Sequence, residues 1–331
     1  MVPAQFGTSL ASLDRYRFTT PRVGGSAAGG GKKFRHADTP IARAGERRSE
    51  MSSEPLLIAN GLSYSYLERF LALEEVSLEV ARGQRLALLG ANGCGKSTLL
   101  KILAGLIFAD RGSYFAFGEE VNAEKLEDEQ FSAGFRSRVG FVFQNTDAQV
   151  FSPTVREEIA FGPLQLGLEP DEIEARISDV TAMLEIEDLI ERAPYQLSAG
   201  QKKRVAIASV LTMNPELLLF DEPTAGLDPR SRHWLLELMT ELGDAGKTIV
   251  FATHELDQLE SIADRCLVLS EQHRRLAVGV PAEILADREL LLTANLVHEH
   301  THRHGERLHS HAHERGHHHR YSGEHGFPSA G

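Results

Sequence analysis

The sequence predicts an α/β fold with a mostly parallel sheet and helices on its faces, because short apolar runs of strand length alternate with helical patterns between residues 54 and 297. Buried strands are expected at 86–89, 139–143, 217–221, 248–253 and 266–269. Helices are expected between them at 97–106, 202–213, 229–243 and 256–263. From 153 to 196 the pattern becomes mainly helical and acidic, which indicates an inserted helical subdomain.

Composition limits the function classes. The 331 residues are 42% hydrophobic and carry a formal net charge of −12, enough for one large domain or two modest ones. Residues 1–50 are basic and residues 298–331 are balanced, so the acidic excess lies between them and argues against a nucleic-acid partner. The two cysteines, Cys94 and Cys266, suit a reducing cytosol, and no apolar run approaches membrane-helix length.

The chain divides into three expected segments. Residues 1–53 are rich in Gly, Ser, Ala and Arg and are expected to be disordered. We interpret residues 1–50 as sequence upstream of a start at Met51, with an Arg-rich transit peptide as the alternative. Residues 54–297 form the folded domain. Residues 298–331 hold eleven of the fifteen histidines and are expected to be a flexible tail.

A glycine-rich loop follows the first of the apolar strands and opens a helix. Its spacing, Gly-x4-Gly-Lys-Ser, is typical of loops whose backbone N–H groups enclose phosphate. Lys96 is expected to reach the β- and γ-phosphates, and Ser97 to offer a hydroxyl to Mg²⁺. The phosphate-binding residues are Gly90, Asn92, Gly93, Cys94, Gly95, Lys96, Ser97 and Thr98.

Two adjacent carboxylates end the apolar strand at 217–221. Asp221 can hold Mg²⁺ through water, and Glu222, pointing elsewhere, can orient or deprotonate an attacking water. Acids placed directly after a buried strand are costly without a cation or water chemistry to use them. The pair therefore predicts hydrolysis of the bound nucleotide, with a solvated strand end as the plain alternative.

Further motifs resemble those of the ATPases that power ABC transporters. Six motifs occur in the family's order over about 54–285. Besides the phosphate loop and Asp221-Glu222, they are Gln144 after its strand, a signature segment, Ala225-Gly226-Leu227-Asp228, and His254. The signature segment is Leu197-Ser198-Ala199-Gly200-Gln201, with Ala199 where the family usually has glycine. Tyr66 stands where the family stacks an aromatic ring on adenine, with Tyr64 as the alternative.

The resemblance implies a P-loop NTPase fold with an N-terminal antiparallel β part, and a dimer that closes on ATP. The phosphate loop of one subunit and Ser198-Ala199-Gly200 of the other would enclose each nucleotide, and Gln201 and Asp228 would also bind it. Glu222 would be the general base and His254 would contact the γ-phosphate. Gln144 would couple Mg²⁺, also held by Ser97 and Asp221, to the surface that docks on membrane subunits.

Two stretches, 143–155 and 159–163, resemble a narrower group, the energy-coupling-factor (ECF) ATPases. This implies a peripheral protein on the cytoplasmic face of the cell membrane, whose partners are a second ATPase subunit, a transmembrane coupling protein and a substrate-binding membrane subunit. The histidine tail suggests a nickel or cobalt cargo, because imidazole suits Ni²⁺, Co²⁺ and Zn²⁺. The candidate ligands are His298, His300, His302, His304, His309, His311, His313, His317, His318 and His319.

Other readings stay open. The cargo could be a vitamin, and the tail could be idle, handle Zn²⁺ or sense pH. A non-transport ABC ATPase, acting in DNA repair or on ribosomes, is less consistent with the acidic core and with only 102 positions between Lys96 and Ser198. A metal-storage or metal-chaperone protein with an ATPase domain is the alternative from another class.

Overall fold

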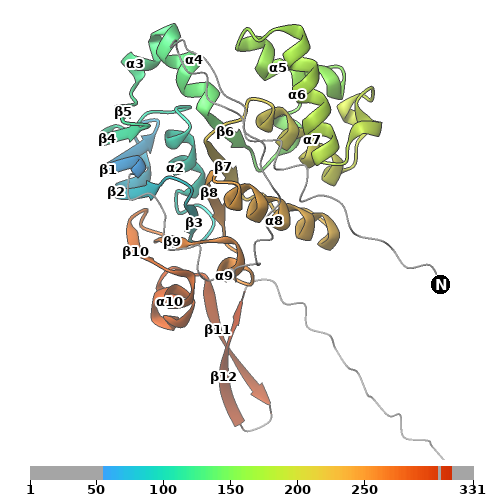
Figure 1. The fold of residues 1–331 in the computed structure, drawn as a ribbon. Coiled ribbons are helices and arrows are strands. Elements are labelled where there is room, and N and C mark those ends of the chain that lie inside the picture. Colours follow the sequence, from blue (N-terminus) through green and yellow to red (C-terminus); the bar gives the residue numbers. More distant parts are fainter. Residues whose placement is uncertain (1–54, 305–306, 315–331) are drawn as a thin grey trace, which may run out of the picture.

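The computed structural model describes residues 55–304 and 307–314 (Figure 1). In this part of the chain the strands form three sheets. The largest has the order β10-β9-β3-β8-β7-β6, in which β10 is antiparallel to β9 and all other neighbours are parallel. Its strands are β3 (Arg85–Leu89), β6 (Val139–Val142), β7 (Leu217–Asp221), β8 (Thr248–Thr253), β9 (Arg265–Leu269) and β10 (Arg275–Gly279).

A second, antiparallel sheet lies beside the first and has the order β2-β1-β4-β5. Two long strands, β1 (Pro55–Tyr66) and β2 (Phe70–Ala81), form a hairpin, and β4 (Arg111–Ala116) with β5 (Glu119–Glu120) completes the sheet. Together the two sheets confirm the predicted fold class.

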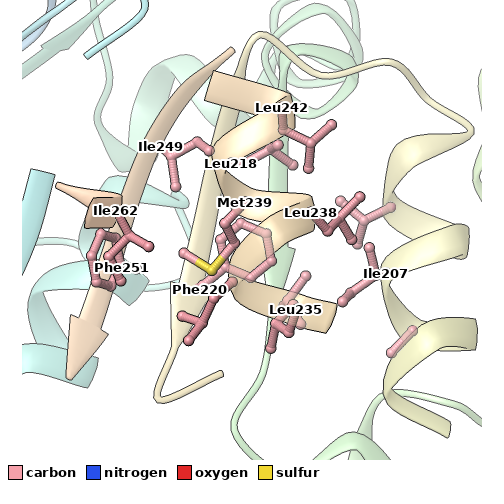
Figure 2. Close-up of a cluster of buried hydrophobic side chains, with 14 of the residues drawn as sticks. Ile207, Leu218, Phe220, Leu235, Leu238, Met239, Leu242, Ile249, Phe251 and Ile262 are labelled. Carbon is pink, nitrogen blue, oxygen red and sulfur yellow. The ribbon is translucent and has the colours of Figure 1, made fainter. Parts of the chain in front are cut away.

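Alternation of side chains along the central strands builds two cores, because successive residues of a strand point to opposite faces of the sheet. Leu218 and Phe220 of β7 pack into the core shared with the helices α7 (Ala199–Leu211) and α8 (Pro229–Asp244). Leu217 and Leu219 pack into the core shared with α2 (Lys96–Leu103) and the antiparallel sheet. Figure 2 shows Phe220 against Met239 and Leu235 of α8. The near-continuous apolar runs in the sequence reflect burial on both faces.

Some of the helices cover the two faces of the large sheet. Others form a separate group beyond β6 (Figure 1). That group contains α5 and α6, which lie inside the predicted helical subdomain. The helices are α2 (Lys96–Leu103), α3 (Ala123–Glu127), α4 (Glu129–Arg138), α5 (Val155–Gln165), α6 (Pro170–Met183), α7 (Ala199–Leu211), α8 (Pro229–Asp244), α9 (Leu259–Ile262), α10 (Pro281–Ala286) and α11 (Arg288–Thr293), with short 3-10 helices η3 (Thr146–Ala148), η4 (Glu187–Leu189) and η5 (Pro194–Gln196). None of the described helices is long and apolar enough to cross a membrane.

Some boundaries differ from those expected. Helix α7 begins at Ala199 rather than 202, because Ser198 and Gln201 form a reciprocal capping box at its start. Helix α9 covers only Leu259–Ile262, since the residues after His254 are held in a turn. The helices α3 and α4 and the elements after β9 were not anticipated; α3, β10, α10 and α11 have only five or six residues each, too few to show a clear period.

The first part of the tail contains one further pair of strands. Residues 297–304 and 307–314 form an antiparallel pair, β11 (Val297–His304) and β12 (Arg307–Glu314). The physical reason is that histidine alternates with other residues in both segments, which is the period of a β-strand. Residues 1–54, 305–306 and 315–331 lie outside the described residues. They include the N-terminal segment predicted to be disordered, the rest of the tail, and His317, His318 and His319.

Truncation of Phe220 tests the core on which the site stands. Phe220 is fully buried in β7, so Phe220→Ala should lower the free energy of unfolding by about 3–5 kcal/mol in a urea titration. Phe151 is 67% exposed, and Phe151→Ala is the matched control, with an expected loss below about 1 kcal/mol. Equal losses in the two variants would contradict this assignment of the core.

Candidate functional site

The phosphate loop leaves the end of β3 and enters α2 with a backbone that only glycine accommodates. Gly95 precedes α2 with a φ of 110°, and a Cβ on it would lie 2.2 Å from the carbonyl oxygen of Ala72. A Cβ on Gly90 would lie 2.5 Å from Cys94 Sγ. The missing side chain of Gly95 lets the loop lie close against β2, and at Gly90 the neighbouring Cys94 and Leu269 leave no room for a side chain. Cys94 is itself buried, and burial raises the pKa of its thiol, so it packs rather than reacts.

Lys96 is buried at the centre of this loop. Its Nζ donates to the carbonyl oxygens of Gly90 at 2.8 Å and Ala91 at 3.1 Å, and it lies 3.5 Å from Glu222 Oε1. The ammonium is therefore held at the mouth of the loop beside the predicted general base. A charge fixed by backbone carbonyls in this way is placed to contact phosphate oxygens.

Glu222 follows the last residue of β7 with a positive φ of 41°, an unusual conformation for a residue other than glycine. Its N–H donates to Ala252 O of β8 at 3.2 Å, which holds the turn in place. Its Oε2 lies 2.8 Å from His254 Nδ1. The two groups are poorly aligned, so Nδ1 makes no hydrogen bond within the described residues. The carboxylate and the imidazole thus meet from two neighbouring strands.

Ser97 and Asp221 offer an oxygen pair suited to Mg²⁺. The Ser97 hydroxyl donates to Asp221 Oδ1 at 2.8 Å. Burial raises the pKa of Asp221, while the bond from Ser97 lowers it. Hydroxyl and carboxylate oxygens are the ligands Mg²⁺ prefers beside nucleotide phosphates, so the residues present fit this ion.

Lys96, Ser97, Glu222 and His254 line one open pocket of about 610 Å³, a volume typical of small-molecule sites. Of the other predicted residues, Gly90, Cys94 and Asp221 do not line it. Tyr66 lies on its wall, where its hydroxyl is 3.2 Å from Thr98 Oγ1; Tyr64 does not line the pocket but contacts the Tyr66 ring edge-on at 4.9 Å. The lining residues are Tyr66, Phe70, Leu71, Ala72, Asn92, Gly93, Gly95, Lys96, Ser97, Thr98, Gln144, Glu222, Ala225 and His254.

The predicted signature residues and Asp228 do not line this pocket. Ser198 Oγ accepts from the Gln201 N–H at 3.3 Å, and Gln201 Oε1 accepts from the Ser198 N–H at 3.0 Å. Asp228 caps α8, where its Oδ1 accepts from the N–H groups of Arg230 and Ser231. Ala199 and Gly200 form the first turn of α7. The chain therefore gathers one half of the predicted site and leaves the other half apart from it.

Sequence reasoning missed several residues around the site. Phe70, Leu71 and Ala72 line the pocket because the β1–β2 hairpin folds back and pairs Phe70 with Tyr66. Glu255, next to His254, accepts from Arg232 Nη2 at 2.9 Å. The alternating apolar pattern of 70–80 was a readable signal for the hairpin, but no local signal marks the pairing of Glu255.

The fold and pocket define a P-loop nucleotide-binding ATPase. The chain matches the family model for ABC transporters over residues 73–225. It is 45% identical over 246 residues to the nickel import ATP-binding protein NikO of Rhodobacter capsulatus, covering 73% of this chain and 96% of that one. It is 43% identical to the energy-coupling factor transporter ATP-binding protein EcfA of Methanothermobacter thermautotrophicus, covering 71% and 74%.

Among solved structures, cbiO1 from Clostridium perfringens, described as part of the ABC transporter complex cbiONQ, aligns with a TM-score of 0.63 and 35% identity over 74% of this chain and 96% of that one. With identities above 40% across nearly all of a relative's length, this chain belongs to the ATP-binding proteins of the ABC transporter family.

The packing of the phosphate loop can be tested at two glycines. Gly95→Ala places a methyl against the Ala72 backbone and should weaken ATP binding more than about tenfold, measured by titration with a fluorescent ATP analogue. Gly93→Ala is the matched control, since a Cβ there meets nothing within 4 Å and only its φ of 84° opposes the change. Equal weakening in both variants would contradict the packing argument.

Proposed function

We propose that this chain is the ATP-hydrolysing subunit of an ECF-type importer for nickel or cobalt, and that it works as a dimer with a second ABC ATPase subunit. One observation carries the dimer: the phosphate loop, Glu222 and His254 share a pocket that Ser198 does not line. A second subunit would supply its own Ser198, Ala199, Gly200, Gln201 and Asp228 to the open side of the pocket. ATP would then be enclosed by two chains.

Each side chain has a role in the proposed reaction. Lys96 and the loop N–H groups would hold the phosphates, and Tyr66 would stack on adenine. Glu222 would take a proton from the attacking water, while His254, beside it, would contact the γ-phosphate. Ser97, Gln144 and Asp221 would hold Mg²⁺, which neutralises charge on the phosphate oxygens when bound. Because Glu222 Oε2 and His254 Nδ1 lie 2.8 Å apart, loss of the γ-phosphate would change the surroundings of both side chains.

An exposed apolar surface on the helical region supports docking on a transmembrane coupling protein. The rings of Phe151 and Phe161 pack edge-on at 5.3 Å, yet they are 67% and 44% exposed. Leu164 and Tyr195 are also exposed there. Aromatic side chains left in water mark interaction surfaces, and Phe151 and Phe161 follow the segment of Gln144 in the chain. A peripheral position at the cytoplasmic face of the membrane, beside a substrate-binding membrane subunit, accords with this.

The cargo assignment is supported by names and by histidines. One relative is named for nickel import, and the resemblance of 143–155 and 159–163 to ECF ATPases agrees with the relative named EcfA. The proposal covers both nickel and cobalt, since imidazole binds both ions. A vitamin importer with the same motor is the alternative cargo.

The backbone register of the tail favours a metal-binding role. In the β11–β12 pair, His298 stands opposite His313, His300 opposite His311, and His302 opposite His309. Directly opposed positions on antiparallel strands have their Cβ atoms about 5 Å apart, and imidazole is the commonest nitrogen ligand of Ni²⁺, Co²⁺ and Zn²⁺. We propose that this ladder of three pairs binds such an ion near the importer. Metal binding by opposed histidines would explain why histidine alternates with other residues in both strands. A tail with no function would not explain it.

Glu222→Gln tests the motor. It keeps the shape of the side chain but removes the base, so ATP should bind with nearly unchanged affinity while hydrolysis falls more than about 100-fold. The same variant, expressed with candidate membrane partners, should abolish ATP-dependent uptake of ⁶³Ni²⁺ or Co²⁺. Uptake of a vitamin and no metal by the native chain would contradict the cargo, and unchanged hydrolysis in the variant would contradict the role of Glu222.

The histidine ladder is tested with a rearranged tail of identical composition. Exchanging the residues within the pairs 298/299, 300/301 and 302/303 moves the histidines of β11 out of register with those of β12. The rearranged chain should bind Ni²⁺ at least about tenfold more weakly in isothermal titration, because opposed ligand pairs are lost. Equal affinity would show that histidine content alone matters. ATP hydrolysis should be unchanged in both chains, and its loss would contradict the assignment of the tail as an accessory.

A further inference from the structure

A buried lysine outside the predicted site connects two of its parts. Lys203 lies on α7, five residues after Ser198, and only 2% of it is exposed. Burial lowers the pKa of its ammonium to about 8. A buried cation is costly unless it finds good partners, so its partners indicate its purpose.

Those partners are backbone carbonyls at the end of β6. Lys203 Nζ donates to Phe143 O at 3.2 Å and to Gln144 O at 3.3 Å. No carboxylate within 4.0 Å forms an ion pair with it in the described part of the chain. The ammonium therefore holds the backbone from which the Gln144 side chain reaches the wall of the nucleotide pocket.

The neighbouring contacts hold the same segment to the same helix. Lys202 Nζ pairs with Asp147 Oδ1 at 2.5 Å, so two successive lysines of α7 contact the segment that follows β6. Within this segment, Gln149 Oε1 accepts from the Phe143 N–H at 2.9 Å, and Gln149 Nε2 donates to Phe141 O at 3.2 Å. The start of the segment is thus internally bonded and attached to α7; further along, the N–H groups of Phe151 and Ser152 donate to Glu158 Oε2 of α5.

Stability alone does not explain this arrangement. An apolar side chain of similar length could fill the volume of Lys203 without desolvating a charge, and replacements of that kind are often neutral or stabilising. The two carbonyls lie at a strand end, where water or a backbone group can also satisfy them. What a lysine adds is a directed link between α7, whose first turn holds the signature residues, and Gln144.

We propose that Lys203 is a positioning residue that ties the backbone of Gln144 to the helix beginning after Ser198, so that Gln144 engages Mg²⁺ only in step with the seating of that helix. The inference rests on the Mg²⁺ role proposed above for Gln144. Through this one side chain, the signature residues at the start of α7 and the nucleotide pocket of the same chain would move together.

A double-mutant cycle in the full-length chain tests the link. Lys203→Met removes the donor and keeps the length. It should raise about tenfold the Mg²⁺ concentration needed for half-maximal binding of a fluorescent ATP analogue, measured without turnover, and the concentration needed for half-maximal ATPase activity, as loss of groups that orient metal ligands does. Gln144→Ala should raise both concentrations as well. Combined with Gln144→Ala, Lys203→Met should add less than about twofold, since both changes act on one contact.

Three further variants keep the outcome interpretable. Lys203→Arg retains the charge and the donors and should restore the Mg²⁺ requirement to within about threefold of the native value. Lys125→Met, on α3 and away from the pocket, should leave the requirement unchanged. If thermal unfolding shows that Lys203→Met does not fold, Lys203→Gln, which shortens the link, takes its place in the cycle.

The outcomes separate the two proposals. If Gln144→Ala leaves the Mg²⁺ requirement unchanged, the role of Gln144 is wrong and the inference on Lys203 is overturned with it. If Gln144→Ala raises the requirement but folded Lys203→Met does not, or the two effects multiply independently, only the inference on Lys203 is overturned. Non-additive effects with rescue by arginine support it.

Discussion

The parallel pairing of β3, β8 and β7 is the constraint on which the site depends. In this register Leu89 stands beside Thr253, and Asp221 beside Ala252. Three buried strands therefore end at one edge of the sheet, and the chain leaves that edge as the phosphate loop, as Glu222 and as His254. Ligands of open α/β sheets bind outside the carboxyl ends of the strands for this reason. A shift in the register of either strand pair would move Glu222 away from the phosphate loop.

Much of this was predictable because the signals are local. A glycine-rich loop between an apolar strand and a helix needs only the spacing around Lys96, and strands buried on both faces need only short runs of Leu, Val, Ile and Phe. The Asp221-Glu222 pair was found in the same way, since adjacent acids after such a strand are costly. Placement at one edge followed from the expectation of parallel strands.

Other features depend on distant contacts and could not be predicted. The positive φ of Glu222 is held by β8, which lies thirty residues further along the chain. The burial of Lys203 depends on α7 packing beside the end of β6, and a lysine in a basic tripeptide suggests a solvated surface instead. In the tail, the polar composition predicts a chain without regular structure, whereas the alternation of histidine with other residues has the period of a strand. For β11 and β12 the alternation predicts the secondary structure better than the polarity does.

The departure at Ala199 illustrates how the half-site of α7 tolerates change. Ala199 is the first helical residue of α7, and a helical backbone accepts alanine better than any other residue. The capping box uses the acceptor side of the Ser198 hydroxyl for the Gln201 N–H and leaves its O–H free to donate to an anion. The positive N-terminal end of α7, a helix of thirteen residues, also favours an anion at this position. The added methyl is therefore compatible with the proposed role of this turn in closing the nucleotide site of a second subunit.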